Sequence, residues 1–325
     1  MNKMPSFPQK SLFQEILDNL QDPDANLELL HLYQLSDLEG KRLQQLQAIW
    51  GKIPVRRRRI ILENMKEIIT DNYLLSYEAI SRIAINDDDA QTRALAAHSF
   101  FIYETEEIIP TLLHKLENDP DKDVRATCAS SLGKFTYLGE IEELSSECYQ
   151  KIVTCLLNIM RSTAPSIVRR RALEALGFVA HKDVPALIED AYQSDDTDWC
   201  VSALFAMGRS SSSRWKSKVL PMLDHHLAAI RLEAARAVGE IYIKAAIPYL
   251  IELLEDENDS IRNASIWSLS QVGGVDEADL LQQLLEYTDD EDETSFIQDA
   301  LDNLAFNMEM VSLDFSNFPD ENNVF

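Results

Sequence analysis

The chain contains 325 residues, and its 30 Lys and Arg against 55 Asp and Glu give a formal net charge of −25. Non-specific binding to nucleic acid depends on cationic side chains that neutralise phosphates, so this balance argues against a nucleic-acid partner and against an anionic membrane surface. No apolar run is long enough to cross a membrane and the first residues contain no signal-peptide core, so we expect a soluble, cytoplasmic protein.

Residues 1–72 are predicted to form four helices, over 12–20, 27–35, 38–50 and 55–70. They do not match the pattern of the later sequence, so we expect an N-terminal helical cap over residues 1–72. The run Arg56–Arg59 is the densest positive run of the chain. It is either a solvated helix face or a docking patch for an acidic partner.

Residues 229–254 read as one antiparallel helix pair. The first helix carries one apolar stripe, and Ile247, Leu250, Ile251 and Leu254 make a second stripe on the next helix. The first stripe consists of Ile230, Ala234, Ala237, Val238 and Ile241. A single pair cannot bury both stripes, so it must stack on copies of itself. We therefore expect an all-α protein, a right-handed α-solenoid of antiparallel helix pairs over residues 73–306.

Copies of the first helix recur along the chain with an Arg at one register and a Gly eight residues later. The Arg register holds Arg93, Arg125, Arg169, Arg231 and Arg262, with Cys200 in place of Arg in one copy. The Gly register holds Gly133, Gly177, Gly208 and Gly239. A degraded last copy contains Phe296, Ala300, Leu301 and Leu304, with Ile297 at the Arg register. An atypical terminal copy is what capping of a solenoid requires.

The segments DKDVRATCASSLG and SIVRRRALEALG resemble the HEAT-like repeat of the phycobilisome-lyase type, and the resemblance covers about residues 77–306. The motif is specific for the fold and weak for function. The resemblance implies a hydrogen-bonded ladder of Asp and Arg between neighbouring repeats, with Asp123 and Arg125 forming one set and Asp259 and Arg262 another. It implies the same structural role for the Arg register, which includes Arg93, Arg169 and Arg231.

The sequence carries no constellation that predicts catalysis. It contains neither a nucleophile elbow nor a Gly-rich phosphate loop, and none of its six His residues is followed by Glu or paired at a ligand spacing on one helix. We therefore predict no catalytic residue, no metal site and no cofactor. The four cysteines, at positions 128, 148, 155 and 200, form no C-x-x-C pair, which indicates buried free thiols in a reducing compartment.

Helix geometry predicts a face that could bind a partner. Residues two and six positions after the start of the buried stripe point away from it, toward the concave surface of a stack. In the later repeats these positions hold apolar, aromatic and Arg side chains: Arg170, Val201, Phe205, Leu232, Arg236 and Trp267. Such a set has the composition of an interface core. The alternative is tighter packing that buries the same side chains between helices.

Residues 307–325 form an acidic tail that contains no Lys or Arg, and we expect it to be flexible. Phe315 and Phe318, with Asp314 and Asp320 beside them, suggest that the tail could dock on the predicted face. The sequence favours a non-enzymatic scaffold or adaptor that binds another protein or peptide. The alternative is a phycobilin lyase-like subunit acting on a bilin-bearing protein, and the oligomeric state stays open.

Overall fold

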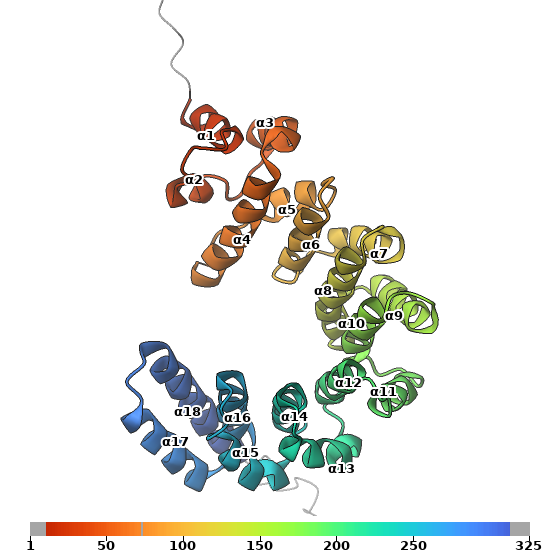
Figure 1. Cartoon of the computed structure of the whole chain (residues 1–325), viewed down its shortest axis with the longest axis vertical. Helices are drawn as coiled ribbons and strands as arrows, with labels where there is room; N and C mark the ends of the chain where they lie inside the picture. The colour runs from red at the N-terminus through yellow and green to blue at the C-terminus, as the bar shows by residue number, and fades with distance from the viewer. Residues whose placement is uncertain (1–10, 73, 313–325) are drawn as a thin grey trace, which may run out of the picture. The chain divides into compact units, whose positions relative to one another are not determined.

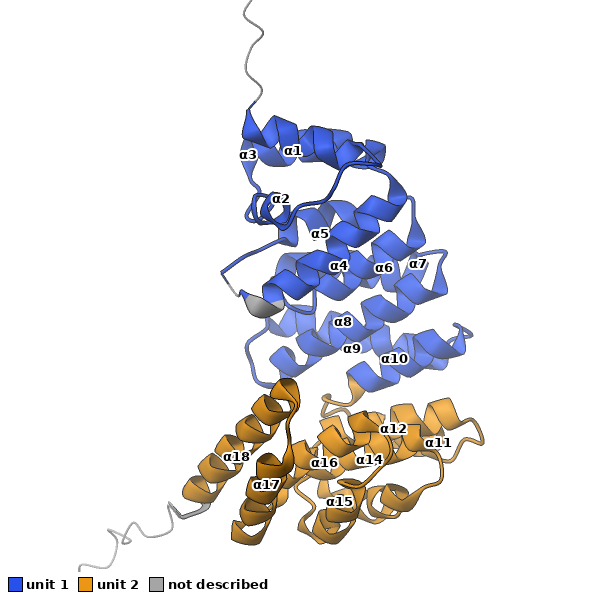
Figure 2. Cartoon of the chain, turned by 60° about the vertical axis from the view of Figure 1, so that its left-hand side comes forward, with its two compact units in different colours: residues 1–175 blue, residues 176–325 orange. Residues whose placement is uncertain are grey.

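The computed structural model describes residues 11–72 and 74–312, and within these ranges every regular element is a helix (Figure 1). The prediction of an all-α fold is confirmed. The chain divides into two compact units, residues 1–175 and 176–325, and each is described by itself (Figure 2).

The first unit begins with the helices that the sequence predicts before the repeats. They are α1 (Leu12–Gln21), α2 (Leu29–Tyr33), α3 (Gly40–Ile49) with a 3₁₀ turn over Trp50–Lys52, and α4 (Val55–Asp71). Ser11 caps α1 by accepting a hydrogen bond from the Gln14 N–H at 3.2 Å. Pro54 precedes α4, where its missing N–H costs no helical hydrogen bond.

Three helix pairs complete the first unit. They are α5 (Glu78–Ala84) with α6 (Ala90–Ser99), α7 (Ile109–Asn118) with α8 (Lys122–Glu140), and α9 (Ser146–Arg161) with α10 (Ser166–Leu176), whose last residue belongs to the second unit. The helices α4, α6 and α8 pack in turn, so α4 occupies the place of a second helix in a repeat.

The second unit contains four further pairs. They are α11 (Val184–Tyr192) with α12 (Thr197–Arg209), α13 (Lys216–Val219) with α14 (Ala228–Glu240), α15 (Ile247–Leu253) with α16 (Asp259–Val272), and α17 (Val275–Tyr287) with α18 (Glu291–Ser312). Short 3₁₀ turns flank α13 and precede α15. We call α12, α14, α16 and α18 the even layer of this unit, because each packs against the next (Figure 1).

The apolar stripe predicted on α14 forms the core between repeats. Its five members, Ile230, Ala234, Ala237, Val238 and Ile241, are all buried. On α15 the prediction is partly wrong, because Ile251 is 37% exposed while Leu253 is buried. The helix is one short run of seven residues, and its buried side is set by Leu250 and Leu253.

Short acidic loops connect the helices of a pair and end in a capping residue. Asp89, Asp121 and Asn258 cap α6, α8 and α16 by accepting backbone N–H groups of the first turn. Two residues before each cap stands Asp87, Asp119 or Asp256, and the side chain of each accepts the N–H of the capping residue at 2.9 to 3.1 Å. This turn aims the second carboxylate oxygen out of the loop.

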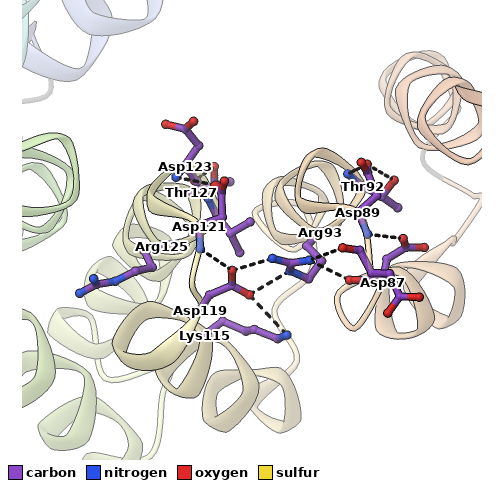
Figure 3. Close-up of polar contacts among 12 residues, drawn as sticks. Asp87, Asp89, Thr92, Arg93, Lys115, Asp119, Asp121, Asp123, Arg125 and Thr127 are labelled. Carbon is purple, nitrogen blue, oxygen red and sulfur yellow. Dashed lines mark hydrogen bonds and ion pairs between the residues drawn. The ribbon is translucent and has the colours of Figure 1, made fainter. Parts of the chain in front are cut away.

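These carboxylates are the acceptors of the ladder. Arg93 donates to Asp119 through Nε at 2.9 Å and Nη2 at 2.8 Å, and its Nη1 donates to the carbonyls of Asp87 and Asp88 (Figure 3). Arg231 reaches Asp256 at 2.8 Å in the same way. Burial alone would raise the pKa of Asp119, but the hydrogen bonds from Arg93 and the Asp121 amide outweigh it and lower this pKa.

The ladder therefore joins neighbouring repeats, but its acceptors are not the residues that the resemblance implied. Arg125 points away from Asp123, and its Nε donates to the Leu116 carbonyl at 2.8 Å (Figure 3). Arg262 does contact Asp259 at 2.7 Å, but both residues lie on α16, so this pair joins no repeats. The acceptor stands one turn earlier, because the carboxylate must lie at the start of the loop to face the preceding helix layer.

The run Arg56–Arg59 is largely structural, which corrects both interpretations of it. Arg57 is buried and donates to the carbonyls of Asn19, Pro23 and Ala25. Arg58 is buried against Asp87, which also accepts the Trp50 indole N–H at 2.6 Å, and Arg59 pairs with Asp89 through two hydrogen bonds. The ladder thus begins on α4, inside the segment predicted to be a separate cap.

Candidate functional site

Five of the six residues of the predicted binding face lie in the even layer of the second unit. Val201 and Phe205 lie on α12, Leu232 and Arg236 on α14, and Trp267 on α16, and each is partly or fully accessible to solvent. The sixth, Arg170, lies on α10 in the first unit, where its side chain is partly buried. The five residues share one layer because each helix repeats the same register against its neighbour.

A pocket of about 290 Å³ opens where α14, α16 and α18 meet. Its lining residues are Arg236, Ser260, Asn263, Ala264, Trp267 and Phe296, and we call this site the aromatic pocket. Two aromatic side chains and one cation therefore line a surface hollow beside two groups that can form hydrogen bonds. Trp and Arg are among the residue types that dominate binding energy in protein interfaces.

The position of Trp267 depends on the absence of a side chain at Gly239. A Cβ built on Gly239 would lie 2.8 Å from Cζ3 of Trp267 and 2.6 Å from Oγ of Ser268. Ser268 is itself fixed by a hydrogen bond of 2.6 Å to the Ala235 carbonyl. The Gly register therefore lets α14 and α16 approach closely, and at this repeat it leaves room for the indole ring that lines the pocket.

Phe296 lines the pocket, although the sequence pattern placed it on the buried face of the last repeat. The degraded last repeat was expected to bury Phe296, with Ile297 at the Arg register. In the structure Ile297 is fully buried together with Ala300 and Leu304, whereas Phe296 is partly exposed. The packed face of α18 therefore begins at Ile297, and Phe296 lies at its edge.

A second aromatic cluster surrounds Arg209 at the end of α12. The guanidinium lies 4.9 Å from the ring centroid of Phe205 and 5.4 Å from that of Phe178, and it pairs with Glu240 at 3.1 Å. Burial raises the pKa of Glu240 above its ordinary value, and Arg209 opposes this rise. Sequence patterns did not find Arg209 or Glu240, because they are brought together by the packing of α12 on α14 across 31 positions of the chain.

The positive charge that lines the aromatic pocket is partly neutralised by an ion pair. Arg236 donates to Glu233 one turn earlier at 2.8 Å, and its side chain is 47% exposed. The remaining lining groups, Ser260 and Asn263, are neutral and exposed. A ligand would therefore meet aromatic faces, amide and hydroxyl groups, and one partly neutralised cation.

The described part of the chain shows little that points to reaction chemistry. Within residues 11–72 and 74–312 no group of three or more His, Cys, Asp or Glu side chains is placed to hold a metal ion. No helix in these ranges is long and apolar enough to cross a membrane. The four cysteines are free, and burial raises the pKa of the Cys128 and Cys155 thiols to about 12, while Cys148 and Cys200 are only partly buried.

The comparison with protein families matches two parts of the chain. Residues 108–138 match the HEAT repeat, and residues 216–302 match the model of HEAT repeats. The chain contains HEAT repeats. The second match includes all six residues that line the aromatic pocket, and it ends at residue 302 within α18.

Solved structures of similar fold include the YibA protein of Escherichia coli, which is 17% identical over 93% of this chain and 99% of that chain, with a TM-score of 0.41. The complex of CpcE and CpcF of phycocyanin lyase from Nostoc sp. PCC7120 is also 17% identical, over 70% and 94% of the two chains, with a TM-score of 0.48. Kap95p bound to RanGDP is 12% identical over 90% of this chain and 46% of that chain, with a TM-score of 0.43. The comparison with curated proteins found no match.

The predicted tail over 307–325 begins too early, because α18 continues to Ser312. Asn307 belongs to the helical layer, and its side-chain amide donates to the Ser270 carbonyl at 3.0 Å. The proposed docking residues Phe315 and Phe318, with Asp314 and Asp320, lie outside the described residues. Docking of the tail on the predicted face therefore stays a prediction.

Proposed function

We propose that this HEAT-repeat protein is a non-enzymatic, cytoplasmic adaptor that binds a partner protein on the even layer of its second unit. The observation that supports the proposal is the aromatic pocket, where Trp267 and Phe296 present partly exposed rings beside Arg236. Monomeric proteins seldom leave aromatic side chains open in a shared hollow unless the surface has a partner. HEAT repeats serve as interaction surfaces because stacked helices present one long row of side chains.

The openness of the pocket favours a partner side chain over a free small molecule. Sites for small molecules and cofactors commonly occupy about 300–1,000 Å³ and enclose most of the ligand. The aromatic pocket has about 290 Å³ and lies open at the surface. An apolar side chain could insert into it, while Ser260 and Asn263 would hydrogen-bond to the peptide backbone that carries this side chain.

The proposal extends from the pocket along α14 and α12. Leu232 and Arg236 lie one turn apart on α14, and Val201 and Phe205 lie one turn apart on α12. Each pair continues the row of accessible side chains toward the cluster around Arg209. An extended or helical segment laid along this row would bury its own apolar side chains at several points, with the pocket as the anchor.

A site-specific photo-crosslinker tests this assignment. Placed at Asn263, which is exposed and lines the pocket, it should form a defined adduct with a partner protein in cells, and Phe296→Ala should abolish that adduct. The matched control places the same crosslinker at Glu255, an exposed position in the loop before α16 that does not line the pocket. Equal adducts from both positions, or none from either, would contradict the proposal. A bilin chromophore bound to the chain would instead support the lyase-like alternative.

A further inference from the structure

The last helix of the chain presents a second surface, on the side that no further repeat covers within the described residues. Along α18, Ile297, Ala300 and Leu304 are buried against the preceding helices. On the outer side, Phe306 is 60% exposed and Met310 is 47% exposed. Two large apolar side chains one turn apart therefore lie open to solvent on a helix whose inner face is already packed.

Acidic residues continue the same exposed line of the helix. The members Asp292, Asp299, Asp302, Phe306 and Met310 are spaced by seven, three, four and four residues, which places them on one face of a helix, and all are exposed. We call this set the terminal stripe. It combines an apolar end with a negatively charged remainder.

The last two helices carry a strongly negative charge. No Lys, Arg or His follows Arg262 in the chain, whereas twelve Asp and Glu residues stand between Asn263 and Ser312. Neither α17 nor α18 can therefore supply a cation to the terminal stripe. Like charges on one helix face repel each other, so a cationic ligand would relieve this repulsion as well as cover the two apolar side chains.

The same charges decide between the possible occupants. A second copy of the chain that used the same face would bring acidic residues against acidic residues. The residues after Ser312 include Asp314, Asp320 and Glu321 and no cation, so they repel the stripe too. Anionic lipid is excluded on the same ground. What remains is a basic segment of another protein that carries apolar side chains.

We propose that the terminal stripe binds a Lys- and Arg-rich amphipathic segment of a partner protein. Apolar side chains of this segment cover Phe306 and Met310, and its cations lie against Asp292, Asp299 and Asp302. The surface is distinct from the aromatic pocket, and the inference does not depend on the function proposed for that pocket.

The probe for this proposal is a fluorescent amphipathic peptide of Leu and Lys, titrated with the full chain and followed by fluorescence anisotropy. The parent chain should bind it, and Asp292→Asn, Asp299→Asn and Asp302→Asn combined should weaken binding by roughly tenfold. Phe306→Ser should weaken it to a comparable extent, of roughly tenfold, through loss of apolar contact area. Increasing salt should weaken the parent more steeply than the triple variant.

A charge-matched control separates a defined surface from general attraction to an acidic protein. Glu142→Gln, Glu143→Gln and Glu255→Gln remove the same charge at exposed positions elsewhere and should change binding by less than about threefold. Equal weakening by the two triple variants would overturn the proposal. So would equal binding of a peptide of Leu and Glu, or a parent chain that dimerises through Phe306 and thereby blocks the probe.

Discussion

Arg93 and Asp119 form a two-point hydrogen-bonded pair across 26 residues of sequence, and both side chains are almost fully removed from solvent. The pair fastens the loop before α8 to the helix of the preceding repeat. Because the guanidinium also donates to the carbonyls of Asp87 and Asp88, one side chain connects two consecutive loops. The stability of the first unit should therefore depend on this carboxylate more than on any exposed ion pair.

Asp119→Asn should destabilise the first unit by about 3–5 kcal/mol, because it leaves the buried Arg93 without its counter-charge. Urea unfolding followed by circular dichroism measures the change. Glu147→Gln is the control, since Glu147 and Lys151 form an ion pair whose side chains are 79% and 60% exposed. This control should unfold like the parent, and identical unfolding of both variants would show that the ladder contributes no stability.

Gly239→Ala should destabilise the second unit by about 1–3 kcal/mol, because the added methyl group overlaps Trp267 and Ser268. It should also shift the fluorescence of a variant in which Trp267 is the sole tryptophan. Gly51→Ala serves for comparison, because a Cβ there meets no atom within 4 Å. Retention of the parent spectrum would mean that the indole is not held against α14.

Leu250→Asp should unfold the second unit at least locally, with a loss of about 4 kcal/mol or more, because it places an unpaired charge in a fully buried position. Val238→Asp should act in the same way, since Val238 is equally buried. The neighbouring Ile251→Asp is the matched test, because Ile251 is 37% exposed. Thermal melting should separate Leu250→Asp from Ile251→Asp, and equal melting temperatures would refute the assigned orientation of α15.

Glu240→Gln should become more stabilising relative to the parent as the pH rises. Burial raises the pKa of Glu240, so the folded chain holds this proton more tightly than the unfolded chain does. The stability that the proton contributes is complete below the ordinary Glu pKa of 4.5, and it is lost as the pH rises through the raised, folded-state pKa. Gln cannot lose a proton there. Unfolding measured over this pH range should show a growing difference, and a constant or shrinking one would argue against burial of this carboxylate.

Truncation should distinguish the contribution of α18 to stability from that of the residues that follow it. Removing residues 313–325 should leave the melting temperature unchanged, whereas removing 307–325 should cost about 1 kcal/mol by deleting the Asn307 hydrogen bond to Ser270. The sole-tryptophan variant at Trp267 adds a second measurement. An unchanged indole spectrum after removal of 313–325 would show that the tail does not contact Trp267 in the aromatic pocket.

Periodicity predicted the parts of the fold that depend on one helix at a time. The stripe from Ile230 to Ile241 on α14 is buried as expected, because each of its members faces the neighbouring repeat through the same register. The end of α1, predicted at residue 20 and observed at Gln21, also agrees closely, because Pro23 could not continue the helix without removing a backbone hydrogen bond. The short helix α15 was less predictable, since a run of seven residues leaves two neighbouring faces that fit the same pattern.

The sequence pattern did not predict the features that depend on contacts between residues far apart in the chain. The acidic loops contain several Asp residues, and the pattern alone could not tell that Asp119 and Asp256 accept from Arg while Asp123 does not. Arg57 and Arg58 looked like surface cations because their acceptors lie in other elements. Phe296 joins Trp267 in the aromatic pocket only because α18 packs against α16, which no local signal specifies.

The ladder is interrupted within the second unit, and this has a mechanical consequence. Between α12 and α14 both halves of a rung are replaced, since Cys200 stands at the Arg register and His225 occupies the place of the loop aspartate. This junction is held by close apolar packing, with Gly208 against Ala237, and by the pair of Arg209 with Glu240. Apolar contacts resist sliding less sharply than directional hydrogen bonds do. Under an external load the second unit should therefore flex at this junction before it flexes between α14 and α16, where the pair of Arg231 and Asp256 holds together the two helices that carry Arg236 and Trp267.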